Sequence, residues 1–325
     1  MSDARENDLK LAKNMNSENE NDSVIAVLVT WKPDIARLKR VIGNLLPQVS
    51  TLIIVDNGSP NIDSARSFLC GIDGIDFIGL SENMGLGAAL NIGLRRAQSL
   101  LPSWILTLDQ DTVICNSAIE QLLRSWIALP VTLRNNCGLL AMKVSAPTRT
   151  NWFSKYSDRI LTIRDMGTFI EKRAVITSGN LLRGNLGAEI SFNSSFFIDQ
   201  IDFDFCAKLR RHGYNIFEHK HVCMDHKLGE QVNTARGVHS YENAERLYYI
   251  TRNSTYLVIR RQLSARYYIA QLVAWSGAYV LTNGFGWAVH CSAVLLLGIF
   301  DGTLSRLGQR KYRILHKGKR SSTVQ

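Results

Sequence analysis

The sequence predicts an α/β protein with a mostly parallel central sheet and a helical region toward its carboxyl-terminal end. Between residues 24 and 126, short apolar runs alternate with helical patterns, which is typical of a parallel sheet covered on both faces. From residue 267 to residue 300 the chain has no Asp, Glu, Lys or Arg. An uncharged stretch of that length is rare in a soluble domain and is long enough to cross a bilayer.

The first part of the chain supplies strands and helices in alternation. Strands are expected where apolar runs end in turn residues, over 24–30, 51–55, 76–80 and 104–108. Helices are expected where apolar residues recur at helical spacing, over 35–46, 63–69, 87–99 and 117–126. Ser117 and Glu120 stand three residues apart and predict a capping box at the start of the last of these helices.

Composition divides the chain into three parts. Residues 1–22 are polar and net acidic, and we expect a disordered tail there. Residues 23–230 are expected to form one large α/β domain, with one half over 23–115 and the other over 116–230. Residues 231–325 are expected to form a helical, membrane-associating region that ends in a basic tail.

The net charge of +10 is concentrated in that basic tail. Seven cationic residues follow Asp301 with no further acid: Arg306, Arg310, Lys311, Arg313, Lys317, Lys319 and Arg320. No module that combines aromatic and basic residues accompanies them, so we predict no nucleic-acid partner. Next to an apolar stretch, the cations are expected to rest on the anionic lipid of an inner-membrane surface.

Polar residues and glycines interrupt the uncharged stretch, at Gln271, Asn283, Gly284, Gly286 and His290. Spanning helices rarely carry so many breaks, so we favour a re-entrant or interfacial pair of helices. A soluble helical subdomain that buries this surface is the alternative.

Asp109-Gln110-Asp111 follows an apolar strand directly. Side chains two residues apart on a strand point to the same side, and two carboxylates that close repel each other unless a cation lies between them. A divalent cation held by one or two carboxylates and by phosphate oxygens is a common way to bind a nucleoside diphosphate. The alternative is a solvated turn after the strand.

Thr30, Asp56, Asn83 and Asp109 all lie at or just after the carboxyl ends of expected strands. Ligands of open α/β sheets bind at the carboxyl ends of the strands, so these residues are expected to share one site. The glycine-rich run 85–90 has Leu where a dinucleotide fingerprint needs its last Gly, and it does not follow the first strand. Its glycines are expected to let the backbone approach phosphates at a helix start.

These segments resemble the nucleotide-sugar half of family-2 glycosyltransferases of GT-A fold, over residues 27–30, 54–59, 83–93 and 108–111. Later segments resemble the acceptor-side motifs of bacterial rhamnosyltransferases, over 177–180, 197–206, 225–229, 248–253 and 298–302. The resemblance spans roughly residues 24–310. It implies a GT-A catalytic domain with a nucleotide-sugar half and an acceptor half, and a divalent metal, Mg²⁺ or Mn²⁺.

The resemblance also implies roles for the residues at the strand ends. Thr30 and Trp31 would line the pocket for the base, with Trp31 as an ordinary core residue as the alternative. Asp56 would accept a hydrogen bond from a base N–H, and Asn83 and Gly85 would approach the donor. Asp111 would be the direct metal ligand, and Asp109 would contact either the ribose or the metal. His226 is a metal or diphosphate ligand or a structural histidine.

Inverting transfer also needs a general base for the acceptor hydroxyl. A helix is expected over about 199–212, on which Asp199 and Asp202 share a face and Asp204 points away. The family pattern aligned on residues 201–204 gives Asp202 as the base. Ile201 stands where many members carry Glu, so Asp199 stays a rival candidate.

The function expected from this resemblance is transfer of L-rhamnose from dTDP-L-rhamnose to a lipid-linked oligosaccharide in O-antigen or other cell-surface polysaccharide synthesis. The alternatives are a family-2 transferase that uses a UDP-hexose, a metal-dependent nucleotidyltransferase and a non-catalytic nucleotide-binding protein. The six cysteines form no C-x-x-C pair and are expected to be buried thiols of a reducing compartment. The expected location is therefore the cytoplasmic face of the bacterial inner membrane, in peripheral or monotopic attachment.

Overall fold

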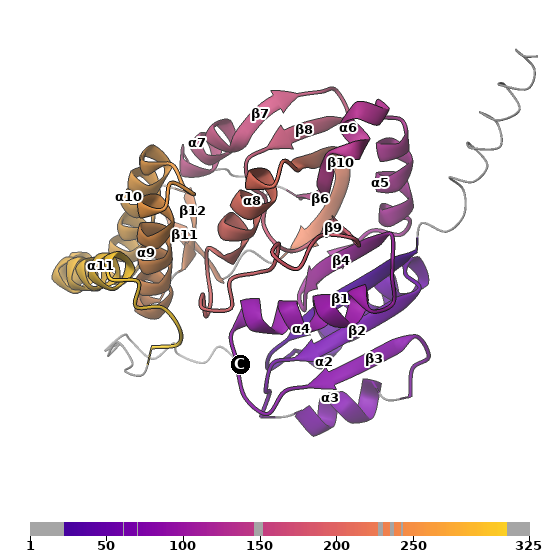
Figure 1. Ribbon diagram of the computed structural model, residues 1–325. Helices are drawn as coiled ribbons and strands as arrows, with labels where there is room; N and C mark the ends of the chain where they lie inside the picture. The colour runs from indigo at the N-terminus through magenta and orange to yellow at the C-terminus, as the bar shows by residue number, and fades with distance from the viewer. Residues whose placement is uncertain are drawn as a thin grey trace, which may run out of the picture.

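The computed structural model describes residues 23–60, 62–69, 71–145, 152–226, 230–234, 237–241 and 243–310. Its centre is a ten-stranded sheet in the order β3-β2-β1-β4-β9-β6-β10-β8-β7, with β5 paired to β10 beside this path (Figure 1). The strands are β1 (Val24–Thr30), β2 (Thr51–Asp56), β3 (Ile75–Gly79), β4 (Trp104–Asp109), β5 (Thr112–Ile114), β6 (Cys137–Val144), β7 (Thr162–Asp165), β8 (Phe169–Lys172), β9 (Asn180–Arg183) and β10 (Asn215–His226).

The first four strands are parallel, as the alternating pattern predicts. Beyond β4 the sheet is mixed, because β9 lies between β4 and β6 and is antiparallel to both. β10 is parallel to β6 but antiparallel to β5 and β8. Parallel pairing is therefore concentrated in the half where strands and helices alternate in the sequence.

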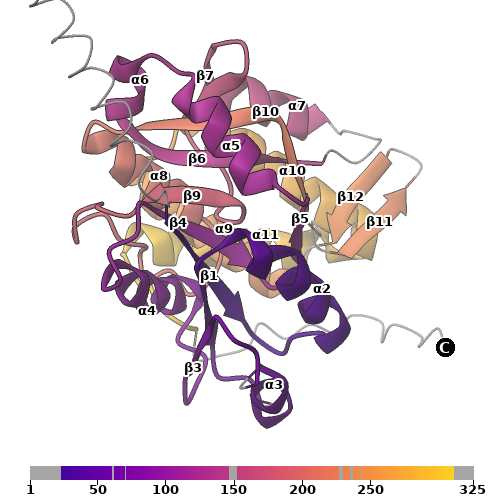
Figure 2. The same ribbon diagram turned by 90° about the vertical axis from the view of Figure 1, so that its right-hand side faces the viewer.

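Two apolar layers cover the two faces of the sheet, because neighbouring residues on a strand point to opposite sides. Ala26 and Leu28 of β1 pack into the layer that α2 (Ile35–Leu45) and α5 (Ala118–Ile127) cover, and Figure 2 shows these helices on one face. Ile25 and Val27 pack into the layer that α4 (Leu86–Gln98) and α8 (Ile201–Arg211) cover. The wholly apolar β1 is thus a central strand that is buried on both sides.

The remaining helices are shorter or lie in the C-terminal region: α3 (Ile62–Leu69), α6 (Val131–Asn135), α7 (Trp152–Leu161), α9 (Ala244–Ile259), α10 (Ala265–Asn283), α11 (Ala288–Thr303) and the 3-10 turns η1 (Leu46–Gln48) and η2 (Phe285–Trp287). The predicted capping box of α5 is wrong. Ser117 has a left-handed backbone with φ 60° and makes no side-chain cap hydrogen bond, because that backbone does not aim its hydroxyl at the first turn.

The C-terminal region consists of a two-stranded hairpin, β11 (Glu230–Thr234) and β12 (Gly237–Tyr241), followed by α9, α10 and α11. The three helices lie together at one side of the molecule, in orange and yellow in Figure 1. Gly298 and Gly302 let α11 pack closely against α9: a Cβ at Gly298 would lie 2.9 Å from Cβ of Thr251, and one at Gly302 would lie 2.8 Å from Cβ of Thr255.

Parts of the sequence predictions lie outside the described residues. These are the expected disordered tail over 1–22, Cys70, and the five cationic residues of the basic tail that follow Arg310. Five described cysteines are free thiols. Cys137, Cys206 and Cys291 are buried as expected, whereas Cys115 is exposed and departs from that prediction.

Candidate active site

Thr30 and Asp56 stand side by side in the register of β1 and β2, at the carboxyl edge of the sheet. Both are buried. The Thr30 hydroxyl donates to Asp56 at 2.9 Å, and the backbone N–H and the hydroxyl of Ser59 donate to the same carboxylate at 2.8 and 2.7 Å. Asp56 therefore holds the turn after β2, and its predicted contact with a base N–H stays a prediction.

The turn after β2 also holds the glycine loop that precedes α4. Nδ2 of Asn57 donates to Oδ1 of Asn83 at 3.0 Å, and the same oxygen accepts from the backbone N–H of Gly85 at 2.9 Å. Gly85 has φ 88°, and a Cβ there would lie 2.8 Å from the carbonyl oxygen of Phe197. Only glycine fits this backbone, which brings the loop against the segment in front of α8.

Asp109, Asp111 and His226 form the predicted metal group. Each offers one ligand atom, and the three atoms lie within 4.8 Å of one another. Asp109 ends β4, Asp111 follows it by two residues, and His226 ends β10, which pairs with β5 at Thr112. Carboxylate oxygens and an imidazole nitrogen are a ligand set that divalent metals accept, so these residues fit the metal that the resemblance implies.

Burial raises the pKa of Asp109 to about 6. The charge of His226 lowers this pKa and the charge of Asp111 raises it. A carboxyl in this state is one that a cation would stabilise in its charged form.

The hydroxyl groups of Thr112 and Ser178 connect the residues of the metal group. The Thr112 hydroxyl lies 2.7 Å from Nδ1 of His226 and 2.7 Å from the Ser178 hydroxyl. Ser178 in turn accepts from the backbone N–H of Asp109 at 2.9 Å. This chain fixes the imidazole relative to the strand that carries the carboxylates, which is what a ligand histidine needs. Nδ1 of His226 also lies 3.6 Å from Oδ1 of Asp111.

Two residues without a predicted role contact the segments that carry Trp31 and Asp111. Oε1 of Gln110 accepts from the backbone N–H of Trp31 at 2.8 Å, and its Nε2 donates to the Trp31 carbonyl at 3.1 Å. The guanidinium of Arg37 donates to the carbonyl of Asp111, from Nε at 2.9 Å and also from Nη2. Gln110 lies inside the Asp-Gln-Asp motif and Arg37 is six residues after Trp31, and no other sequence signal marks either residue.

Trp31 is 44% exposed, so the alternative that it is an ordinary core residue is wrong. It follows the last residue of β1, where the chain leaves the sheet, and Nζ of Lys32 lies 4.5 Å from its ring centroid. An exposed indole at the carboxyl edge is available to stack on a base.

Asp202 is on the first turn of α8, and its Oδ1 accepts from the backbone N–H of Phe203 at 3.0 Å. Burial raises the pKa of Asp202 to about 7, and the charges of Asp199 and Asp109 add to the rise. Since the charge of Asp109 contributes to this rise, Asp202 lies within electrostatic range of the metal group. A carboxyl with a pKa near 7 is suited to accept a proton under physiological conditions.

The two neighbouring aspartates are held by cations. Asp199 lies before α8, which begins two residues later than expected because Asp199 and Gln200 have φ of 64° and 62°. Its carboxylate pairs with Arg246 at 2.7 Å. Asp204 is buried and pairs with Lys208 at 2.7 Å. The predicted helix face shared by Asp199 and Asp202 is wrong, because Asp199 precedes α8. Asp202 is thus better suited than Asp199 to act as a base.

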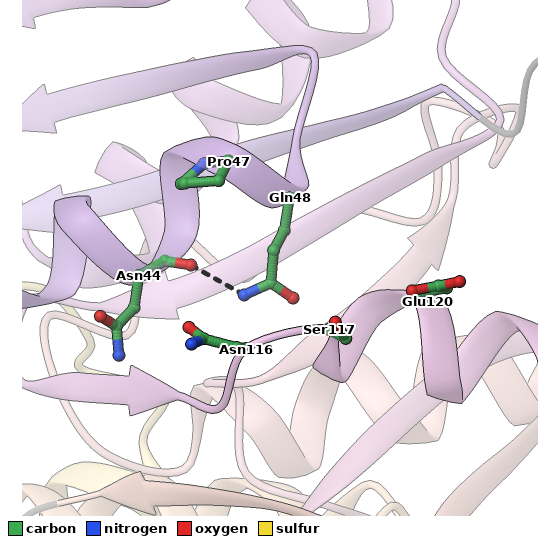
Figure 3. Close-up of a pocket in the computed structure, with 6 residues that line it drawn as sticks. All are labelled: Asn44, Pro47, Gln48, Asn116, Ser117 and Glu120. Atoms are coloured by element: carbon green, nitrogen blue, oxygen red, sulfur yellow. Dashed lines mark hydrogen bonds between the residues drawn. The ribbon is translucent and has the colours of Figure 1, made fainter.

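A separate polar pocket lies between the end of α2 and the start of α5 (Figure 3). Its lining residues are Asn44, Pro47, Gln48, Asn116, Ser117 and Glu120, and the amide of Gln48 donates to the carbonyl of Asn44 at 2.7 Å. None of the described site residues predicted from the sequence lines it.

Comparison with known proteins relates the chain to glycosyltransferases. Residues 26–134 match the model of the family "Glycosyl transferase family 2". The chain is 24% identical over 254 residues to the dTDP-rhamnosyl transferase RfbF of Shigella flexneri, across 74% of this chain and 81% of that one.

Among solved structures, GalNAc-T7 with UDP, GalNAc and Mn²⁺ matches with a TM-score of 0.51 at 11% identity, over 87% of this chain and 57% of that one. S. aureus TarS 1-349 in complex with UDP-GlcNAc matches with a TM-score of 0.49 at 14% identity, over 86% and 80%.

The comparisons identify the protein as a glycosyltransferase and confirm the expected GT-A fold. Residues 26–134 match family-2 glycosyltransferases, and the chain resembles a bacterial rhamnosyltransferase. The alternatives of a nucleotidyltransferase and of a non-catalytic binding protein are not supported.

Proposed function

We propose that the protein is an inverting, metal-dependent rhamnosyltransferase that uses dTDP-L-rhamnose and extends a lipid-linked glycan of the bacterial cell surface. The observation that carries the catalytic part is the Asp109–Asp111–His226 group, which lies near enough to Asp202 for the charge of Asp109 to help raise the pKa of Asp202. The relative from Shigella flexneri, a dTDP-rhamnosyl transferase, supports the donor.

In the proposed reaction Asp202 accepts the proton of the acceptor hydroxyl. The oxygen then attacks the anomeric carbon from the side opposite the diphosphate, so the new C–O bond forms with inversion as the bond to the diphosphate oxygen breaks. A metal held by Asp109, Asp111 and His226 would neutralise the charge that develops on the leaving diphosphate. Trp31 would stack on the base, and the backbone of the Gly85 loop would approach the donor.

A UDP-hexose donor is the second candidate, because the Mn²⁺-containing neighbour in fold was solved with UDP. A missing hydroxyl is discriminated only where the site leaves a polar group unpaired, so the two donors call for direct competition. Product formation from dTDP-L-rhamnose and from UDP-hexoses, each with and without chelator, tests the proposal. Preference for a UDP-hexose would refute the donor, and full activity in excess chelator would refute the metal.

We also propose that the C-terminal helices attach the enzyme to the cytoplasmic face of the inner membrane. Among the described residues, one segment, Phe285–Thr303, is long and apolar enough to cross a membrane. An 18-residue stretch of it has a mean hydropathy of 1.5, and 22% of that stretch is buried. Exposed apolar residues follow the hairpin of α10, η2 and α11: Ile269, Val273, Leu281, Phe285, Val289, Leu296 and Phe300. A soluble subdomain would bury these side chains, whereas an interface with lipid would use them.

Vesicle flotation tests the attachment. Phe285→Ser combined with Val289→Ser removes two side chains that are 84% and 82% exposed, and binding to vesicles with anionic lipid is expected to fall several-fold. Ile127→Ser on α5, where the side chain is 49% exposed, is the matched control and should leave binding unchanged. Equal binding of both variants would refute attachment through the hairpin.

A further inference from the structure

The backbone in front of Asp202 adopts a costly conformation. Asp199 and Gln200 both have positive φ, at 64° and 62°, and neither is glycine. The left-handed region is unfavourable for residues other than glycine, so two such residues in succession persist only where the surroundings hold them. This pair sets the position at which α8 starts, and therefore where Asp202, its second residue, points.

Two side chains of α9 hold this pair. Nδ2 of the buried Asn253 donates to the carbonyls of Ile198 and Asp199, both at 2.9 Å. Nη2 of Arg246 donates to Oδ1 of Asp199 at 2.7 Å. The two residues are seven positions apart, which is two helical turns, so both face the segment before α8.

On its other side the same segment contacts the glycine loop that precedes α4, which we call the donor loop for its proposed role. The backbone N–H of Leu86 donates to the carbonyl of Phe197 at 3.0 Å, next to Gly85. The ring of Phe197 lies 5.7 Å from that of Tyr249 on α9. The segment is thus enclosed between the donor loop and α9.

The rear of α9 is fixed by α11. Thr251 and Thr255 pack on Gly298 and Gly302 at distances that leave no room for another side chain. A shift of α11 therefore has to move α9, because closely packed helices do not slide freely.

We propose that Arg246 and Asn253 are positioning residues that aim Asp202 at the acceptor, and that α9 makes the C-terminal helices part of the catalytic apparatus. The proposal rests on the proposed role of Asp202 as the base. It predicts that loss of either contact lowers kcat without weakening nucleotide binding, since neither side chain belongs to the metal group or to the base pocket.

The electrostatics give a readout that a purely structural role would not change. The carboxylate of Asp199 raises the pKa of Asp202, and the guanidinium of Arg246 offsets that charge. The other groups near Asp202 are Asp109, which is also acidic, and the neutral Tyr267 and Cys206. Arg246→Gln should therefore move the acidic limb of the pH–rate profile to higher pH, and Asp199→Asn should move it to lower pH.

The test uses the full chain, with dTDP and Mn²⁺ as the binding probe. Arg246→Gln and Asn253→Ala are expected to lower kcat by about ten- to a hundred-fold, with the dTDP affinity within about two-fold of wild type. The Arg246→Gln/Asp199→Asn double variant should restore the acidic limb but not kcat. Arg246→Lys should recover part of the lost kcat. Arg260→Gln, at the exposed end of the same helix, is the matched control and should change neither quantity.

Wild-type kcat and an unmoved acidic limb in Arg246→Gln would overturn the proposal. If Arg246→Gln fails to bind dTDP, the variants Asp199→Asn and Arg246→Lys decide instead. The proposal is then overturned if the acidic limb of Asp199→Asn is unmoved and both variants keep full kcat. Failure of the underlying function is recognised separately, because Asp202→Asn would then keep most of its activity while the α9 variants still lose theirs.

Discussion

Replacing Asp202 by asparagine is expected to have opposite effects on activity and on stability. The amide keeps the shape of the carboxyl but accepts no proton, so kcat should fall by roughly two to four decades. The affinity for the nucleotide should change little, since the base acts on the acceptor. The wild-type enzyme should show an acidic limb in kcat/KM with a midpoint near pH 7, because burial raises the pKa of Asp202 to about that value.

The stability effect follows from the same pKa. In the folded protein Asp202 holds its proton up to about pH 7, whereas in the unfolded chain it loses the proton near its ordinary value of 3.8. The carboxyl therefore costs nothing below pH 3.8, and the free energy of unfolding falls as pH rises toward 7. At about 1.4 kcal/mol per pH unit this interval corresponds to about 4 kcal/mol. Because Asp202 is half-buried and solvent screens part of this effect, we expect about 1–3 kcal/mol of it.

Asp202→Asn should accordingly be more stable than wild type at pH 8, and the difference should vanish at pH 4. Thermal or urea unfolding at both pH values, in chelator so that bound metal does not contribute, measures it. Release of the nucleoside diphosphate gives the pH–rate profile. An acidic limb below pH 5, together with equal stability at pH 8, would refute the reasoning that Asp202 is desolvated and serves as the base.

Three further predictions follow from the contacts. Asp111→Ala should abolish transfer but leave the melting temperature within a few degrees, because Arg37 contacts the backbone carbonyl of Asp111 and not its carboxylate; retained activity would contradict the metal role. Thr30→Val should cost about 1–3 kcal/mol in the free energy of unfolding, since it removes a hydrogen bond to the buried Asp56, and an unchanged urea midpoint would speak against it. Gly302→Val should cost about 1–3 kcal/mol by forcing α11 from α9, whereas Gly277→Ala, with nothing within 4 Å, should be neutral or stabilising in the same melt.

The first half of the fold could be predicted because its strands are continuous apolar runs and its helices are amphipathic. β1, β2, β3 and β4 all lie within two residues of their expected bounds. The strand order beyond β4 could not be read, because β9 is a four-residue strand whose pairing with both β4 and β6 is a tertiary outcome. Short strands of this kind carry too little pattern to show their direction.

The site was predictable where residue type and strand position agree. Asp109 and Asp111 were visible as a pair, and the structure places His226 beside them, which the sequence left open. The contacts of Arg246 and Asn253 were not visible, because they join residues about fifty positions apart through a backbone conformation that no local pattern signals. The boundary of α8 was wrong by two residues for the same reason.

The two hydrogen bonds between Gln110 and the backbone of Trp31 have a thermodynamic consequence. They join the segment that carries Asp109 and Asp111 to the exposed indole for which we propose stacking on a nucleotide base. If the base displaces Trp31, the hydrogen bonds of Gln110 transmit that displacement to the carboxylates of Asp109 and Asp111. Part of its free-energy cost then falls on metal binding. Metal and nucleoside affinities would then be coupled, and by linkage each would change the other by the same factor. Substitution of Gln110 would reduce this coupling while leaving all three metal ligands in the chain.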